Sequence, residues 1–192
     1  MILNTASPTA SLAGLIITCV IDSHEKRDVA TVDIPGAFLQ TKMPQNEDDV
    51  HVVLDGKIAE LLAKIFPDTY QKYVHHKRGQ AYIYCKLNVA LYGTLKAAIL
   101  FWKKLSKSLK EMGFTVNPYD CCIANNIING SQCTIVWQVD DLKLSHKYSK
   151  VIDKIIASLD EKYSKTGKMT VRRGKIYEYL GDCCLTFLFE EF

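Results

Sequence analysis

The stretch "TIVWQVDDLKLSH" (residues 134–146) places two adjacent carboxylates, Asp140 and Asp141, inside a segment that otherwise has the character of a β-strand. Asp is a poor strand former, and the two negative charges repel each other. Apolar residues flank the pair, so two strands joined there would form a tight hairpin with both carboxylates at its tip. Like charges at the rim of a packed sheet are costly unless a cation neutralises them. The segment therefore predicts a metal site, with a turn built from Asp alone as the alternative.

A third carboxylate ends another expected strand. The segment "DVATVD" (residues 28–33) alternates as a strand does, and the Pro-Gly pair that follows Asp33 must bend the chain away. If this strand neighbours the hairpin, Asp33, Asp140 and Asp141 meet at one end of a sheet. Carboxylates are the hard oxygen ligands that Mg²⁺ prefers, and two such ions about 4 Å apart serve phosphoryl transfer.

The wider pattern predicts an α+β fold, in which helices pack on one face of an antiparallel sheet. The turn "NG" at Asn129–Gly130, between two strand-like runs, is a strong hairpin signal. Apolar periodicity predicts helices over residues 11–21, 57–65, 95–112 and 150–163, and further strands over 50–54, 81–87, 169–171 and 183–189.

Charge is unevenly distributed along the chain, although the net charge is only +3. Residues 71–110, here called the basic block, hold nine Lys or Arg and no Asp or Glu. Such a block predicts a polyanionic partner, and a solvated charged face is the alternative. The apolar run at residues 12–21 is too short to span a bilayer, so no membrane association is expected. Seven cysteines without zinc-ribbon spacing favour free thiols in a reducing compartment over a disulfide framework.

Five segments occur in the order found in one family, and together they cover most of the chain. They resemble motifs of the reverse transcriptase domain of copia-type retrotransposons: "VDIPGAFLQTKMP" (32–44), "KLNVALYGTLKAAILFWKKL" (86–105), "GFTVNPYDCCIAN" (113–125), "WQVDDLKLSH" (137–146) and "YLGDCCLTF" (179–187). The resemblance implies an RNA-directed DNA polymerase with a palm-like antiparallel sheet. Its reaction is attack of a primer 3′-OH on the α-phosphate of a dNTP, with release of pyrophosphate.

The resemblance also implies roles for individual residues. Asp33 and Asp140 would be the main ligands of two Mg²⁺ ions, for which Mn²⁺ can substitute, and Asp141 would support them. Phe38, five residues after Asp33, would exclude a ribose 2′-OH; from the residue alone, a plain core phenylalanine is the favoured interpretation.

Two further groups of contacts follow from the same resemblance. Tyr92 and Gly93 would lie beside the incoming nucleotide, although a stacked core aromatic is an alternative for Tyr92. The basic block would face the template–primer backbone, where phosphate contacts give sequence-independent affinity. Its expected nucleic-acid contacts are Lys96, as the best single candidate, with Lys103 and Lys107.

The chain also departs from the family pattern. Gln138 replaces the usual Tyr before Val-Asp-Asp, and the Gln-Ala-Pro expected after Tyr-Gly-Leu-Lys is missing. No upstream fingers strand, thumb or RNase H segment is recognisable. We therefore expect residues 1–192 to form a single palm-centred, partial domain of a retrotransposon polyprotein. Its expected location is intracellular: the cytoplasm, a virus-like particle or the nucleus.

Two other functions compete with the polymerase. A catalytically inactive remnant would keep the fold and bind nucleic acid without turnover. A carboxylate nuclease would use the same metals to activate water. The nuclease predicts a fourth acid near the three carboxylates and has no need for a steric-gate aromatic such as Phe38.

Overall fold

The structure is a computed structural model that describes residues 8–44, 49–174, 176–179 and 183–186. The chain divides into two compact units. Unit 1 comprises Met1–Thr41 together with Ala90–Phe192, and unit 2 comprises Lys42–Val89. The segment "YLGDCCLTF" includes residues 180–182 and 187, which lie outside the described residues. Each unit is built on a separate sheet.

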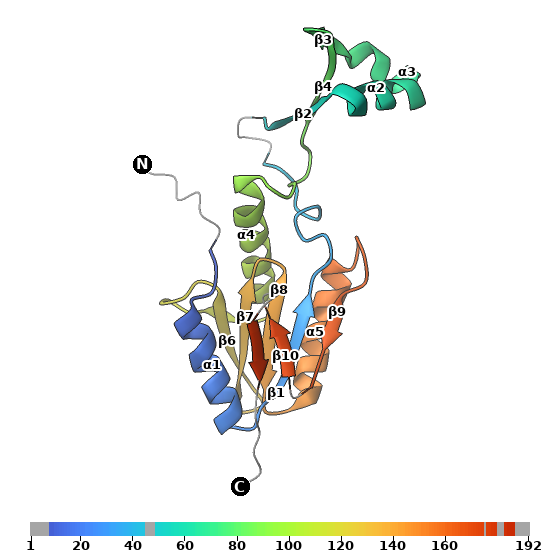
Figure 1. Cartoon of the computed structure of the whole chain (residues 1–192). Coiled ribbons are helices and arrows are strands. Elements are labelled where there is room, and N and C mark those ends of the chain that lie inside the picture. Colours follow the sequence, from blue (N-terminus) through green and yellow to red (C-terminus); the bar gives the residue numbers. More distant parts are fainter. Residues whose placement is uncertain (1–7, 45–48, 175, 180–182, 187–192) are drawn as a thin grey trace. The chain divides into compact units, whose positions relative to one another are not determined.

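Unit 1 is built on a six-stranded antiparallel sheet with the strand order β5-β6-β7-β8-β1-β9 (Figure 1). The strands are β5 (Thr115–Val116), β6 (Ile123–Ile128), β7 (Ser131–Gln138), β8 (Asp141–His146), β1 (Asp28–Asp33) and β9 (Thr170–Arg172). Strand β1, which is close in sequence to neither of its partners, lies between β8 and β9. The expected strand at residues 28–33 is therefore confirmed, and it neighbours the hairpin as anticipated.

The turn between β6 and β7 follows from two residues. Asn129 and Gly130 both have positive φ, at 51° and 74°. That pair of values belongs to a type I′ turn, whose twist matches that of the flanking strands. Ile128 and Ser131 pair directly across it, so the predicted hairpin is confirmed.

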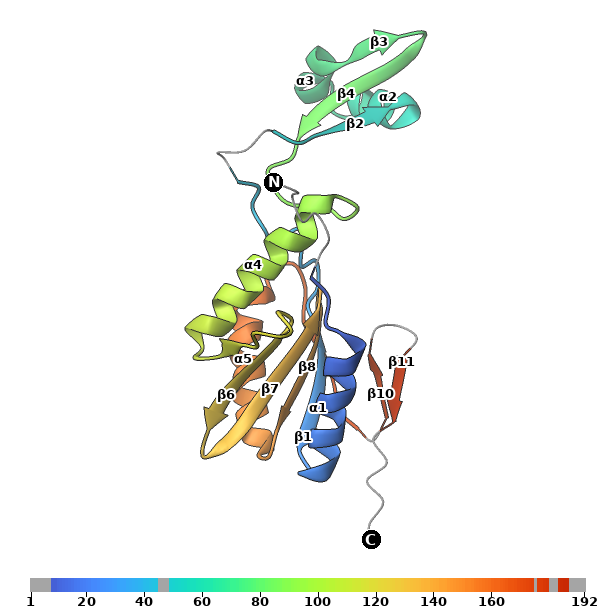
Figure 2. The same ribbon diagram turned by 90° about the vertical axis from the view of Figure 1, so that its left-hand side faces the viewer.

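Helices cover both faces of this sheet, as the two ribbon views show (Figures 1 and 2). Helices α4 (Leu95–Glu111) and α5 (Ser149–Tyr163) lie on one face, and α1 (Leu12–His24) lies on the other. The expectation that all helices pack on one face is therefore wrong for α1. The reason is that β7, β8 and β1 are buried on both faces, so neither face can be left to solvent.

The face under α4 and α5 is apolar. Cross-strand partners point to the same side of a sheet, so the fully buried Trp137 and Leu142 share this face. The rings of Phe101 on α4 and Tyr163 on α5 meet edge-on, with centroids 6.0 Å apart. Helix α4 buries Ala97, Phe101, Leu105 and Leu109. Ile99 and Trp102 of the same helix are only half-buried.

The face under α1 is partly polar. Leu15 packs there against Ile123 and Val136. Beside this apolar contact, the Lys143 ammonium of β8 donates to the Asp22 carboxylate of α1, and both side chains are buried. The pair attaches α1 to the centre of the sheet by charge as well as by apolar contact.

Unit 2 is a small α/β layer. Its antiparallel sheet has the order β2-β4-β3, with β2 (His51–Asp55), β4 (Gln80–Lys86) and β3 (His75–Lys77). The helical segments α2 (Gly56–Ile65), α3 (Pro67–Tyr70) and η1 (Gln71–Tyr73) connect β2 to β3. The buried core joins Ala59 of α2 to Ala81 and Ile83 of β4. The sequence anticipated β2, α2 and β4, but not β3.

A two-stranded sheet completes the described chain, with β10 (Ile176–Tyr179) antiparallel to β11 (Cys183–Thr186). None of the helices in the described part of the chain has both the length and the apolar character needed to cross a bilayer. The cysteines at positions 85, 121, 122 and 133 are free thiols, and of these four only Cys121 is exposed.

Candidate active site

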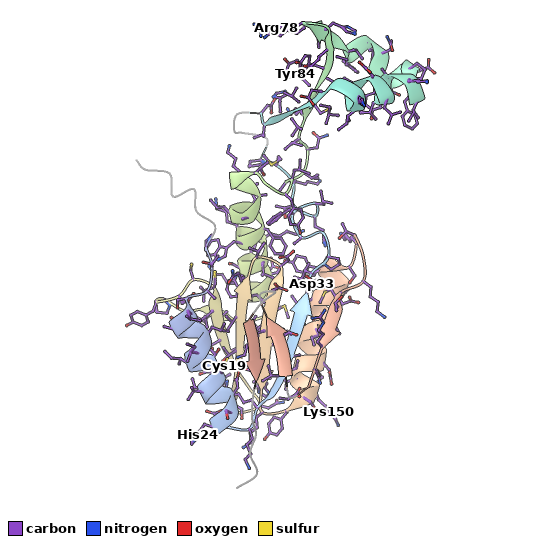
Figure 3. The ribbon with its side chains drawn as sticks, viewed as in Figure 1. Cys19, His24, Asp33, Arg78, Tyr84 and Lys150 are labelled. Carbon is purple, nitrogen blue, oxygen red and sulfur yellow. The ribbon has the colours of Figure 1, made fainter. Side chains whose placement is uncertain are left out.

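One end of the unit 1 sheet, here called the acidic end, carries the three predicted carboxylates: Asp33, Asp140 and Asp141. Asp33 is the last residue of β1 and pairs in register with Asp141, the first residue of β8. Asp140 occupies the turn that precedes β8, and its carbonyl oxygen accepts a hydrogen bond of 3.0 Å from the Ile34 amide. The backbone of β1 is thus fastened to the turn at the point where the acids meet. Asp33 is labelled at this end of β1 in Figure 3.

The turn at the acidic end is strained. Gln138 pairs with Asp141, which leaves a two-residue loop of Val139 and Asp140. Val139 has a φ of 56°, whereas Asp140 does not have a positive φ. A positive φ at the first loop position alone is the pattern of a type II′ turn, which normally has glycine there. A β-branched residue in this region costs of order 1–3 kcal/mol, and such outliers cluster at functional sites.

The carboxylates of the acidic end perturb one another electrostatically. Burial raises the pKa of Asp141, and the charges of Asp140 and Asp33 raise it further. Burial also raises the pKa of Asp33, and the charge of Asp140 adds to the effect. In both cases the Arg172 guanidinium acts in the opposite direction. The three side chains are therefore close enough for their charges to interact, and a cation would relieve their repulsion.

Neutralising one of these acids is expected to stabilise unit 1 at neutral pH. A carboxyl whose pKa is higher in the folded than in the unfolded state favours folding at low pH, and this contribution is lost as the pH rises through the folded pKa. Asp33 and Asp141 face each other across two strands, and such like-charge pairs cost roughly 0.2–1 kcal/mol. Asp141→Asn should therefore raise the free energy of unfolding at pH 7 in metal-free buffer.

Urea unfolding followed by tryptophan fluorescence measures this effect, because both tryptophans, Trp102 and Trp137, lie in unit 1. At about pH 3, below the unperturbed pKa of Asp, Asp141→Asn should no longer raise the free energy of unfolding. Glu161→Gln, an exposed acid on α5, serves as the control and should change stability at neither pH. Equal destabilisation by Asp141→Asn at both pH values would contradict the electrostatic account.

Tyr92 joins the acidic end from a distant part of the sequence. Its hydroxyl donates a hydrogen bond of 3.0 Å to Oδ2 of Asp140. Burial, this hydrogen bond and the neighbouring carboxylate charges together raise the pKa of Tyr92 to about 12. The phenol consequently stays protonated at neutral pH and can act as a hydrogen-bond donor at the acidic end.

Phe38 lies behind Tyr92. Phe38 is 7% exposed; its ring packs against Tyr92 in a tilted arrangement, with centroids 4.3 Å apart, and meets Phe101 edge-on at 6.3 Å. Phe38 therefore packs against two aromatic rings, and Tyr92 is the aromatic residue that hydrogen-bonds a carboxylate. The exclusion of a ribose 2′-OH by Phe38 stays a prediction. Gly93 follows with a φ of +85° and open space where a Cβ would stand, so its backbone conformation is what requires glycine.

The basic block is divided between the two units at residue 89. In unit 1 the lysines of the basic block lie along α4, where Lys96, Lys103 and Lys107 are exposed. The spacing of Lys103 and Lys107 places them one above the other on the same side of the helix. In unit 2 the basic residues lie at the start of η1 and along the β3–β4 hairpin.

The donor set of the acidic end suits a hard divalent cation. Three carboxylates, with no His or Cys among them, are the oxygen ligands that Mg²⁺ and Mn²⁺ accept. Among the residues that the structure describes, however, no three such side chains are already arranged to hold a metal ion. Metal binding at the acidic end would require the carboxylate side chains to rotate toward a common point.

Sequence reasoning missed two functional contacts. Tyr92 was expected beside the nucleotide, but its hydrogen bond to Asp140, 48 residues away, gave no sequence signal. Arg172 was not considered, although β9 pairs with β1 and places Arg172 opposite Thr31. Because side chains alternate along a strand, Thr31 lies on the same side of β1 as Asp33. The register of β9 on β1 therefore places the Arg172 guanidinium on the side of the sheet that carries Asp33.

Similarity of the chain to known proteins was found among solved structures. No family model matches the chain, and no curated protein sequence does either. The chain is similar to apo telomerase from Candida tropicalis, truncated from the C-terminal domain, at 14% identity over 95% of this chain and 40% of that chain (TM-score 0.49). It is also similar to Candida albicans telomerase in complex with a TWJ fragment of telomeric RNA, at 10% identity over 92% and 33% (TM-score 0.44). The chain thus spans less than half of either structure, and likeness at this level carries no argument about activity.

Proposed function

We propose that unit 1 is the catalytic part of an RNA-directed DNA polymerase of the retrotransposon type, which transfers a nucleotide from a dNTP to a primer 3′-OH. The observation that supports this most is the acidic end itself. Two strand termini and a strained turn bring three mutually repelling carboxylates together, and folding tolerates this arrangement at a cost in stability. Costly polar arrangements of this kind are typical of functional sites.

In this proposal Asp33 and Asp140 hold two Mg²⁺ ions, and Asp141 supports them. When bound, the ions would activate the attacking hydroxyl and offset the charge of the triphosphate. The residues of the chain position these groups. Tyr92 orients Asp140 through its hydroxyl, and Phe38 supports the Tyr92 ring from behind.

The phosphate backbone of a template–primer is the proposed ligand of the α4 lysines. Lys96→Ala and Lys103→Ala should each weaken binding to a nucleic-acid duplex and reduce the slope of log affinity against log salt by about one. Fluorescence anisotropy over a salt series measures this slope. Glu161→Gln, which removes an exposed acid from α5, should leave the slope unchanged. A wild-type affinity that does not vary with salt would refute the contact.

Primer extension tests the proposed reaction. The purified chain, an RNA template with a DNA primer and dNTPs are incubated with Mg²⁺ or with EDTA. Template-dependent, Mg²⁺-dependent extension supports the polymerase, and strand shortening in place of extension supports a nuclease.

The second candidate is a nucleic-acid-binding remnant without turnover, and it would show binding and no extension. This candidate is favoured by one observation, the lack of a preformed metal-binding group among the described residues. The nuclease has less support: the carboxyl groups that raise the pKa of Asp33 and Asp141 all belong to the acidic end itself, and a fourth acid is not among them.

A further inference from the structure

Unit 2 has one face of its sheet covered and one face open. On β4, Ala81 and Ile83 are buried against α2, whereas Tyr82 between them is half-buried and the following Tyr84 is 57% exposed. Successive side chains of a strand alternate between faces, so Tyr82 and Tyr84 lie together on the side away from α2. Within the described part of unit 2, residues 42–44 and 49–89, no helix covers this side.

Aromatic and basic side chains share the open face. His75 of β3 pairs with Tyr82 across the strands, and its ring lies 5.9 Å from the ring of Tyr84 at an interplanar angle of 61°. Lys77 pairs with Gln80 further along the same hairpin, and Arg78 occupies the turn with a φ of 51°. Figure 3 labels Tyr84 on β4 and Arg78 at the tip of the hairpin.

The positive charge is concentrated toward the hairpin tip. Lys77 and Arg78 are both exposed there. At the other end of β4, Lys86 forms an ion pair of 2.7 Å with Asp49. Asp55, on β2, pairs with Tyr82 and brings a negative charge to the β2 edge of the same face. An anionic chain is therefore attracted along β3 and β4 and repelled from the β2 edge.

We propose that this open face, here called the tyrosine platform (Tyr82, Tyr84 and His75), binds a single-stranded nucleic acid by stacking its bases. Tyr82 and Tyr84 are two strand residues apart, about 6.7 Å, which is twice the ~3.4 Å rise of a stacked strand. An extended strand with separated bases matches this spacing, and a duplex does not. Stacking on aromatic side chains tolerates any base, and flanking cations meet the phosphates.

The inference rests on the proposed nucleic-acid partner of the chain, but it does not depend on the acidic end or on metal. Binding is therefore measured with the full chain in EDTA, by fluorescence anisotropy of a labelled oligouridylate and of a labelled duplex of equal length. Tyr84→Ala should lower the affinity for oligouridylate about tenfold, because one stacked base is lost. It should leave duplex affinity unchanged, and Tyr84→Phe should retain wild-type affinity for both.

Tyr119→Ala is the matched control, since Tyr119 is 98% exposed and belongs to unit 1. It should change neither affinity. A second measurement avoids variants altogether: ultraviolet crosslinking of the wild-type chain to 5-bromouridine-substituted RNA should give adducts within residues 75–86.

Three results would overturn the tyrosine platform: wild-type affinity for oligouridylate in Tyr84→Ala, an equal loss for oligouridylate and duplex, or adducts confined to unit 1. A change in self-association of Tyr84→Ala without a change in RNA affinity would assign the face to a second copy of the chain instead. If primer extension is lost in Asp140→Asn but retained in Tyr84→Ala, only the tyrosine platform is refuted. Tyr84-dependent binding without extension refutes only the proposed polymerase.

Discussion

Asp22→Asn is expected to lower the free energy of unfolding of unit 1 by about 3–5 kcal/mol, the usual cost of removing one partner from a buried ion pair. The side chain of Asp22 is fully buried, and that of Lys143 is 1% exposed. Asn keeps the shape of the side chain but removes the carboxylate charge to which the Lys143 ammonium donates. The Thr18 hydroxyl, 3.1 Å from the ammonium, is a neutral partner and cannot replace the carboxylate.

Arg27 extends this buried pair into a network. Its guanidinium lies 3.8 Å from Asp22 and bonds Glu25 at 2.9 Å. It also donates to the Thr134 hydroxyl at 3.2 Å. Because Glu25 remains in the variant, Arg27 keeps a counter-charge, and the main penalty falls on Lys143.

Urea unfolding monitored by tryptophan fluorescence measures the loss in unit 1, and the unfolding temperature should fall by about 10 °C. The double variant Asp22→Asn/Lys143→Met should be more stable than Asp22→Asn alone, because it also removes the buried ammonium charge. Glu161→Gln, on the exposed side of α5, should change the free energy of unfolding by less than about 0.5 kcal/mol. A loss below 1 kcal/mol for Asp22→Asn would show that the pair does not hold α1 on the sheet.

The second large effect concerns catalysis. Asp33→Asn and Asp140→Asn should each lower the rate of primer extension at least about 10³-fold, since a metal ion supplies several kcal/mol of charge stabilisation in phosphoryl transfer. Asn preserves the size of the side chain and, at position 140, an acceptor for the Tyr92 hydroxyl. Loss of rate without loss of folding would therefore report on charge at the acidic end.

Asp28→Asn provides the matched control, because Asp28 lies at the opposite end of β1 and forms its ion pair with Arg173. Its extension rate should stay within about twofold of the wild type. Extension by Asp140→Asn at the wild-type rate would exclude the acidic end as the site of transfer.

Most helices and strands of unit 1 were predicted from short-range patterns in the sequence. The segment "DVATVD" indicated β1, although both sides of this strand meet packed layers. The "NG" pair indicated the β6–β7 turn because both residues tolerate a positive φ. Asp140 and Asp141 stood out because carboxylates are rare between apolar strands. These signals depend on neighbours within a few residues, and a single sequence contains them.

Contacts between segments that are distant in the sequence could not be predicted from such short-range patterns. The hydrogen bond of Tyr92 to Asp140 and the approach of Arg172 to the acids depend on how segments far apart in the sequence pack together. Strand β3 was missed because "HHK" is polar throughout and fully exposed, so it has no apolar alternation to detect. Its pairing with β4 creates the tyrosine platform, which the basic block alone did not reveal.

Binding of Mn²⁺ at the acidic end is the measurement that tests the central claim most directly. In an NMR titration of the full chain, the paramagnetic ion broadens the amide signals of residues close to it. The proposal predicts that substoichiometric Mn²⁺ broadens Asp33, Ile34, Asp140 and Asp141 first, that excess Mg²⁺ reverses the effect, and that Asp140→Asn abolishes it. Broadening that spares these four residues, or that is unchanged in Asp140→Asn, would contradict a metal-dependent active site at the acidic end.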